Sequence, residues 1–180
     1  MPKTQKRAGR PLAIMVAAAL LAAVSIICGK YLAIRAGDAM RFSFENLPIL
    51  LGGLAFGPFV GVAVAVSADL IGCLMVGYAI NPIVTVGGAL IGLLSGLGGI
   101  TLKKTPLWLQ VGLTVLIAHL VGSLVVKTIG LAYVYSMPLW QLVLWRLLNY
   151  AIISAAEIPL LYAVLHSRAI KAQLRIIRGR

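Results

Sequence analysis

The stretch LAIMVAAALLAAVSIICGKYLA, from Leu12 to Ala33, decides the class of fold. As a helix it is long enough to cross the hydrocarbon core of a bilayer, which takes about 20 apolar residues. The apolar core of a secretory signal peptide has only about 7–15 residues. We therefore interpret this stretch as a retained transmembrane helix that follows a short basic N-terminus.

Six apolar segments can be drawn within a single domain that covers residues 1–180. They run over residues 12–33, 45–56, 59–78, 82–102, 107–133 and 138–166. The second segment is too short to cross a core of about 30 Å at about 1.5 Å per residue, so we expect a partial span or a helix shielded by protein. Small residues at four-residue spacing, such as Gly88, Gly92 and Gly96, predict close packing between helices. The sequence thus predicts an all-α integral membrane protein with six transmembrane helices.

Charged residues are scarce within these segments, and most of those outside them are basic. Of the 180 residues, 61% are hydrophobic and 11% are charged, whereas an average soluble domain has about 25% charged residues. The net charge is +12, and 11 of the 16 basic side chains lie in residues 1–11, 103–104 and 168–180, where there is no acid. Positive charge flanks membrane spans on the cytoplasmic side. We therefore expect the N- and C-termini to be basic cytoplasmic ends of a chain that lies in a lipid bilayer and does not bind nucleic acid.

Polar side chains inside the rest of the chain mark a candidate binding site, because such groups are costly in a membrane. Helix rise places most of them toward the outer half of the bilayer, with a surplus of positive charge that suits a negatively charged ligand. The candidates are Arg41, Asp69, Asn81, Lys127, Tyr135, Trp145, Arg146 and Asn149. Asp69 could neutralise Arg146 or Lys127, or it could accept hydrogen bonds from the ligand. The aromatic residues could form an interfacial belt or stack on a flat ligand.

No motif in the chain predicts catalysis or a metal site. The HExxH and GxSxG patterns and a phosphate-binding glycine loop with lysine do not occur in the sequence. Cys28 and Cys73 stand alone in apolar segments, and His119 and His166 have no companion at metal-ligand spacing. Glu157 is expected to pair near the cytoplasmic side or to support a partner contact. We expect a protein that is not an enzyme, has no cofactor or metal, and cannot power transport by itself.

Four short stretches carry a resemblance to a known family. They are RFSFENLP over residues 41–48, FGP over residues 56–58, ADLIG over residues 68–72 and GYAINP over residues 77–82. Together they resemble the substrate-binding S components of energy-coupling factor (ECF) vitamin transporters, and the folate-specific branch in particular. The likeness extends over the whole chain, and residues 41–96 are its specific part.

The resemblance implies an S-component-like bundle that captures folate or a related vitamin from outside a prokaryotic plasma membrane with high affinity. The ligand would be handed to a transmembrane coupling protein and two ATPase subunits. Cations would hold the anionic glutamate tail, aromatic residues would stack on the pterin, and an Asn or Asp would pair with the pterin edge. In the family an alanine-rich face of the first helix contacts the coupling protein; Ala19 and Ala23 match it, and Ala18 and Ala22 form a second register.

Two alternatives remain open from the sequence. The chain could be an S component for another vitamin, such as pantothenate or riboflavin. It could instead be a stand-alone secondary transporter that moves its substrate without a partner ATPase. A structural subunit with no ligand is disfavoured, because it would bury the outer cations without purpose.

Overall fold

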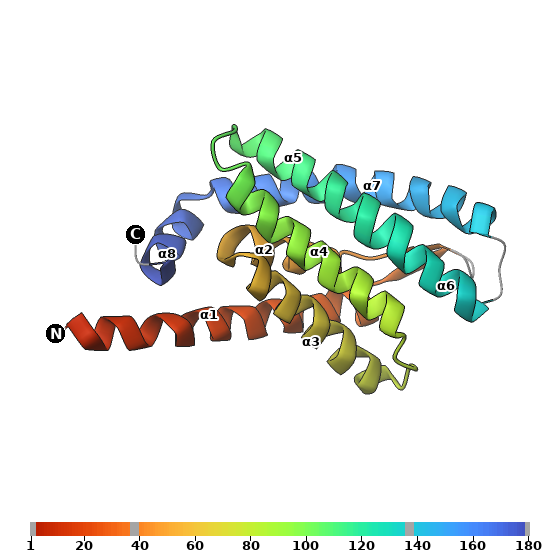
Figure 1. Ribbon diagram of the computed structural model, residues 1–180, viewed down its shortest axis with the longest axis horizontal. Helices are drawn as coiled ribbons and strands as arrows, with labels where there is room; N and C mark the ends of the chain where they lie inside the picture. Colours follow the sequence, from red (N-terminus) through yellow and green to blue (C-terminus); the bar gives the residue numbers. More distant parts are fainter. Residues whose placement is uncertain (1–2, 37–39, 136–138, 179–180) are drawn as a thin grey trace.

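The computed structural model describes residues 3–36, 40–135 and 139–178, which are almost entirely helical (Figure 1). In chain order, with η for a π-helix, the elements are α1 (Lys3–Ile26), η1 (Ile27–Tyr31), β1 (Ile34–Ala36), β2 (Met40–Phe42), α2 (Asn46–Phe56), α3 (Pro58–Val76), α4 (Pro82–Thr101), α5 (Leu107–Ala118), η2 (His119–Lys127), α6 (Thr128–Tyr135), α7 (Leu139–His166) and α8 (Arg168–Arg178).

Five helical stretches are long and apolar enough to cross a membrane. They are Pro11–Tyr31, Pro58–Val76, Pro82–Thr101, Leu107–Tyr133 and Leu142–His166. Large hydrophobic side chains point outward along them; Phe59, for example, is 90% exposed. A soluble monomer rarely exposes apolar surface on this scale. The chain is a multi-pass membrane protein, and the predicted set of one short and five full-length apolar segments is confirmed.

The short apolar segment is α2, and protein surrounds it. It has 11 residues, so it is only about 16 Å long. It packs against α1, α3, α4 and α7, and eight of its residues are buried. Backbone groups at the ends of a short helix cannot be left in lipid without partners. The expectation of a partial or shielded span is therefore met by shielding inside the bundle.

Glycines bring α2, α3 and α4 into backbone contact. A Cβ atom on Gly61 would overlap the backbone of Gly92, and a Cβ on Gly92 would overlap Gly61 and Val62. A Cβ on Gly96 would likewise overlap the backbone at Pro58. The close packing predicted from small-residue spacing is confirmed at Gly92 and Gly96 on α4. Gly77 ends α3 in a left-handed conformation with φ of 68°, which favours glycine.

Three features of the fold differ from the sequence expectation. The connection after η1 contains two short antiparallel strands, with Ile34 opposite Phe42 and Arg35 opposite Arg41, where a plain loop was expected. Pairing supplies hydrogen-bond partners to backbone groups outside the helices. Two segments are π-helical, and a separate helix α8 follows α7 after Ser167. In a segment that is apolar on all sides, hydrophobic periodicity cannot distinguish a π-helix from an α-helix.

One end of the bundle gathers the basic segments. The start of α1, the connection between α4 and α5, and α8 all lie at the left of Figure 1. The connection carries Lys103 and Lys104, which are both exposed. The charge pattern of the sequence predicts that these three segments share one side of the membrane, and their common position in the bundle agrees with that. The cytoplasmic assignment of this side stays a prediction.

Candidate functional site

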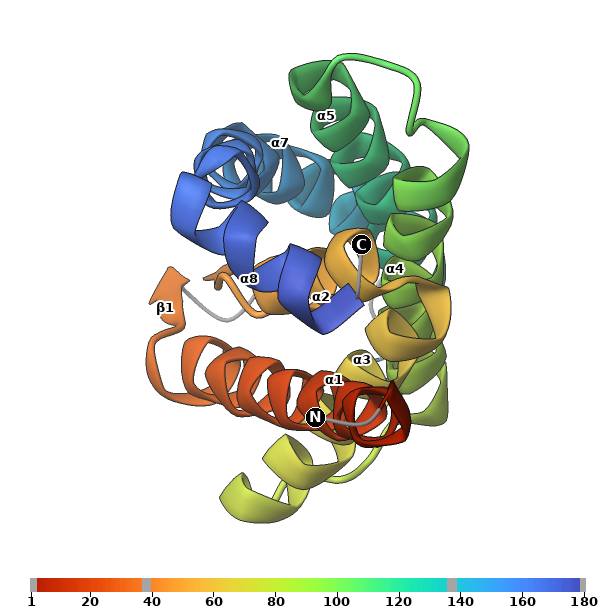
Figure 2. The same ribbon diagram turned by 90° about the vertical axis from the view of Figure 1, so that its left-hand side faces the viewer.

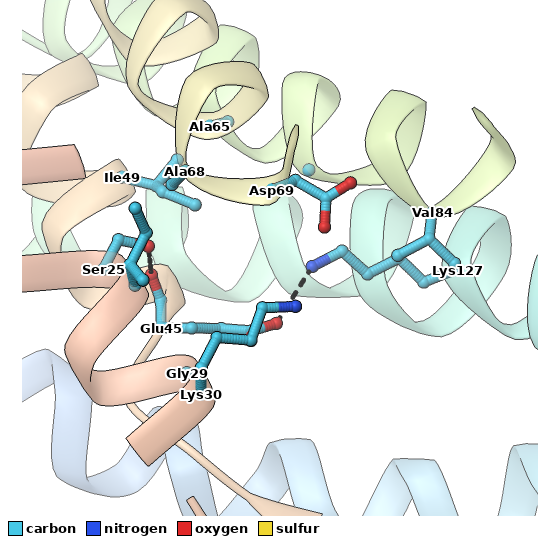
Figure 3. A pocket seen from close by; sticks show the side chains of 12 residues that line it. Ser25, Gly29, Lys30, Glu45, Ile49, Ala65, Ala68, Asp69, Val84 and Lys127 are labelled. Carbon is cyan, nitrogen blue, oxygen red and sulfur yellow. Dashed lines mark hydrogen bonds and ion pairs between the residues drawn. The ribbon is translucent and has the colours of Figure 1, made fainter. Parts of the chain in front are cut away.

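A small polar cavity lies where α1, η1, α3, α4 and η2 meet the start of α2 (Figure 3). Its volume is about 30 Å³, which is room for one or two water molecules. Its polar lining comes from Ser25, Lys30, Glu45, Asp69 and Lys127. Two lysines thus face two carboxylates inside a bundle whose outer surface is apolar.

Lys127 enters the cavity from the last residue of η2. It is 6% exposed, and its Nζ lies 3.4 Å from Oε1 of Glu45 and 3.4 Å from Oδ1 of Asn46. Its stem passes α4 at Gly87, where a Cβ atom would lie 2.6 Å from Cγ of the lysine. The glycine therefore makes room for a cation that reaches across the bundle from η2 to the start of α2.

Lys30 enters the cavity from η1. Its Nζ donates to Sγ of Cys73 at 3.5 Å and lies 5.6 Å from the centroid of the Tyr78 ring. Its Cε would be 2.9 Å from a Cβ on Gly72, so a glycine on α3 makes room for this lysine too. A thiol is a weak acceptor. Both cavity lysines lie in π-helical segments, which occur frequently at functional sites.

Asp69 lines the cavity from α3. Its Oδ2 accepts a hydrogen bond from Oγ1 of Thr85 at 2.6 Å, and its Oδ1 accepts from Sγ of Cys73 at 3.8 Å. Two roles were considered for Asp69: to neutralise a cation, or to accept hydrogen bonds from the ligand. Its contact with Thr85 shows that the carboxylate accepts a hydrogen bond from a hydroxyl group of the protein. Figure 3 shows the Lys127 ammonium and the Asp69 carboxylate pointing into the same space. The ion pair of Lys127 in this state is with Glu45.

Asn81 holds the neighbouring backbone and does not line the cavity. Its Oδ1 accepts from the backbone N–H groups of Ile83 at 3.0 Å and Val84 at 3.4 Å, which caps the N-terminus of α4. Its Nδ2 donates to the carbonyl of Gly130 at 3.2 Å. This side chain therefore ties α4 to α6 just beyond Lys127.

Arg146 and Asn149 lie on α7, outside the lining of this cavity. Nη2 of Arg146 donates to the Ser123 carbonyl at 3.2 Å and to Oη of Tyr150 at 3.0 Å. Nε of Arg146 is buried without a hydrogen-bond partner among the described residues. Asn149 is buried. Ser123 lies about one turn before Lys127, so Arg146 contacts the same π-helix that carries Lys127.

Of the three other predicted site residues, only Trp145 has a side chain among the described residues. Trp145 is exposed on α7. The side chains of Arg41 and Tyr135 lie outside the described residues, although their backbones belong to β2 and α6. The roles proposed for these residues stay predictions.

A second polar cluster joins η2 to α7, in which Glu157 is paired, as one of its two expected roles required, with a partner, His119, that the sequence did not predict. Nε2 of His119 lies 2.5 Å from Oε2 of Glu157, and Nδ1 of His119 lies 3.2 Å from Oγ of Ser123. The His119 ring stacks on Tyr150 at 5.0 Å between centroids. His119 is 3% exposed and Glu157 is 0% exposed. We call this set, with Arg146, the η2–α7 cluster.

Sequence reasoning missed Lys30, Glu45 and Thr85 as lining or contact residues of the cavity. The signal was present for the first two, because each is ionisable and lies in or beside an apolar segment. The depth of Lys30 was judged from the rise of a straight α-helix, whereas this residue lies in the π-helix η1. Among the described residues, no group of three His, Cys, Asp or Glu side chains could hold a metal ion.

The alanines of α1 divide into two faces. Ala22 is 5% exposed, and Ala18 packs against the core. Ala19 and Ala23 are exposed. The Ala18 and Ala22 register therefore packs within the bundle, whereas the Ala19 and Ala23 register is exposed in the isolated chain.

Comparisons with known proteins address the fold and the family. The structure of FolT bound with folic acid has a TM-score of 0.68 and 24% identity over 82% of this chain and 89% of that one. The structure of an S component for biotin from an ECF-type ABC transporter has a TM-score of 0.64 and 16% identity over 93% and 95%. At these identities the likeness concerns the fold. No curated protein matches the chain.

The arrangement of apolar helices is thus shared with a protein bound to folic acid and with an S component for biotin. A family model described as "ECF transporter, substrate-specific component" matches residues 14–174, which is most of the sequence. The chain therefore belongs to the substrate-specific components of ECF transporters.

Proposed function

We propose that this chain is the folate-binding subunit of an ECF importer in a prokaryotic plasma membrane. It captures folate from outside with high affinity and passes it to a coupling protein and two ATPases, with no chemistry on the ligand. The observation that supports folate most directly is the convergence of Lys30 and Lys127 on one buried cavity. The glutamate tail of folate carries two carboxylates, and two ammonium groups from opposite sides suit such a tail.

The acidic side of the cavity suits the other end of the ligand. Asp69 already accepts a hydrogen bond from Thr85, so its oxygens are placed to accept from the amino and N–H groups of a pterin edge. Arg146 and Asn149, on the far side of η2, and the aromatic residues Tyr135 and Trp145 are proposed to complete a larger site. Arg41 is proposed to approach it from β2.

Folate can enter only after the cavity widens. A cavity of about 30 Å³ is far smaller than the 300–1,000 Å³ of typical ligand pockets. The 3.4 Å ion pair between Lys127 and Glu45 must also give way if a ligand carboxylate is to take the lysine. Exchange of one carboxylate partner for another keeps the buried lysine paired throughout. The ligand would thereby stabilise an arrangement whose cavity is wider than the one described here.

Replacing Lys127 with methionine is expected to raise the Kd for folate about thirtyfold. Truncating one partner of a buried charge pair costs about 2 kcal/mol or more, which corresponds to that change in Kd. Isothermal titration calorimetry on the purified chain in detergent measures the effect. Lys103→Met is the matched control, because this lysine is exposed in the α4–α5 connection.

The same titration, run with biotin, riboflavin, pantothenate and thiamine, tests the choice of vitamin. Saturable binding of folate alone supports the proposal. Tight binding of another vitamin would keep the role of the chain as an S component and remove the folate assignment. Equal folate affinity for Lys127→Met and the unmodified chain would contradict the role given to the cavity.

We further propose that Ala19 and Ala23 form the face that meets the coupling protein, because Ala18 and Ala22 are occupied by packing. The double substitution Ala19→Leu and Ala23→Leu is expected to lower recovery of the complex with the coupling protein at least about tenfold, since close helix contact needs small residues. Folate binding by the isolated chain should be unchanged. Co-purification from membranes that contain both proteins measures the complex.

The control places the same two substitutions at the same spacing on another exposed face. Ala151 and Ala155 are both exposed on α7, so Ala151→Leu with Ala155→Leu tests whether bulk on any lipid-facing surface is enough. Recovery of the complex that is equally low for both double variants would contradict a specific role for the α1 face.

A further inference from the structure

Helix α8 combines a basic stripe with apolar residues in a way that the proposed transport function does not use. Arg168, Lys171 and Arg175 follow one another at spacings of three and four residues, so they lie on one face of the helix. All three are exposed, while Ile170 and Leu174 are half-buried. The helix is therefore amphipathic, with its apolar side partly turned to the bundle.

The position of α8 in the bundle places this helix at the membrane surface. It begins at Arg168, only one residue after α7 ends at His166, and α7 is the last stretch able to span a membrane. It contacts α7 and α1. In Figure 2, which views this end of the bundle, α8 runs across it and does not continue the direction of α7. A helix across the end of a transmembrane bundle lies along the plane of the bilayer.

One exposed side chain distinguishes a lipid surface from an acidic protein surface. Ile176 is 70% exposed and directly follows Arg175 on α8. An acidic protein patch would pair with the cations but would leave this isoleucine in water. The boundary between headgroups and acyl chains accepts both kinds of side chain from an amphipathic helix.

We propose that α8 is a membrane-surface helix that binds anionic phospholipids. Arg168, Lys171 and Arg175 contact the phosphates, and Ile176 inserts at the acyl boundary. Polybasic segments beside a membrane span are attracted to anionic headgroups over a distance of about a Debye length. The inference rests on the position of the helix in a membrane protein and stands whatever vitamin the chain binds.

Hydrogen–deuterium exchange of the full chain in nanodiscs tests the proposal. One set of nanodiscs contains phosphatidylcholine alone, and the other contains phosphatidylcholine with phosphatidylglycerol. We expect the α8 amides to exchange at least about tenfold more slowly in the anionic nanodiscs, and high salt should remove most of this difference. Lys171→Gln with Arg175→Gln should reduce the difference to about threefold or less, and Ile176→Ser should also reduce it.

Lys103→Gln with Lys104→Gln is the matched control, since it removes the same charge from the same end of the bundle outside α8 and should keep the full difference. Equal exchange in the two kinds of nanodisc would overturn the proposal. So would full lipid-dependent protection of the Lys171→Gln and Arg175→Gln variant. Protection of α8 that arises only when the coupling protein is added would also overturn it and would assign the stripe to a protein partner.

Discussion

Replacing Glu157 with alanine is expected to lower the free energy of unfolding by about 3–5 kcal/mol, the cost of removing one partner from a buried charged or strongly polar pair. Glu157 is fully buried, and its Oε2 lies 2.5 Å from Nε2 of His119. Its loss would leave Nε2 of His119 without the Glu157 carboxylate and would open a space between two transmembrane helices. Thermal or denaturant unfolding of the purified protein in detergent, followed by circular dichroism, measures the change.

A double-mutant cycle separates the pair from general packing. Combining His119→Ala with Glu157→Ala should cost clearly less than the sum of the single substitutions, because each single change already removes the same interaction. His166→Ala is the control, since His166 is an exposed histidine that stacks on Tyr162 and should change stability by no more than about 0.5 kcal/mol. Additive losses for the two members of the pair would contradict a direct interaction.

Replacing Gly92 with alanine is expected to destabilise the bundle by about 3 kcal/mol, at the upper end of the cost of overpacking. The added Cβ atom would overlap the backbone of Gly61 and the N atom of Val62 on α3. A backbone cannot move aside as a flexible side chain can, so α3 and α4 would have to separate. Alanine favours a helix over glycine by about 1 kcal/mol, so any loss of stability must come from the contact with α3.

Gly112→Ala provides a matched comparison for this substitution. Gly112 lies inside α5, and a Cβ atom there would meet nothing within 4 Å. The same glycine-to-alanine change should therefore be neutral or stabilising by up to about 1 kcal/mol. Unfolding midpoints of the two variants, measured side by side in one detergent, decide the matter. A Gly92→Ala protein as stable as Gly112→Ala would contradict the close approach of α3 and α4.

The transmembrane helices could be predicted because their boundaries have chemical signals. Asn81 followed by Pro82 starts α4, with the asparagine as its N-cap. Gly57 followed by Pro58 separates α2 from α3. The two π-helices could not be predicted, since their neighbours are apolar on all sides and the change from α to π leaves no periodic signal. The strands β1 and β2 have only three residues each, too short for an alternating pattern to be distinguished.

The site was predicted only in part. Asp69 and Lys127 were identified because an ionisable group inside an apolar segment is costly, and the structure brings both to one cavity. Arg146 was expected to share that cavity, but it faces Ser123 and Tyr150. Its direction depends on how α7 is rotated against η2, and sequence alone does not determine that rotation. Which of these side chains touch the vitamin stays a prediction.

The small size of the cavity also bears on the rates of binding and release. If a vitamin enters only a wider, less populated form of the protein, its association rate constant falls in proportion to the fraction of time that form exists. If the bundle also closes the entrance behind the bound vitamin, release needs that entrance to open again, so dissociation is slowed as well. High affinity would then arise from a long residence time more than from fast capture. Such kinetics suit a protein that must retain its ligand until another protein receives it.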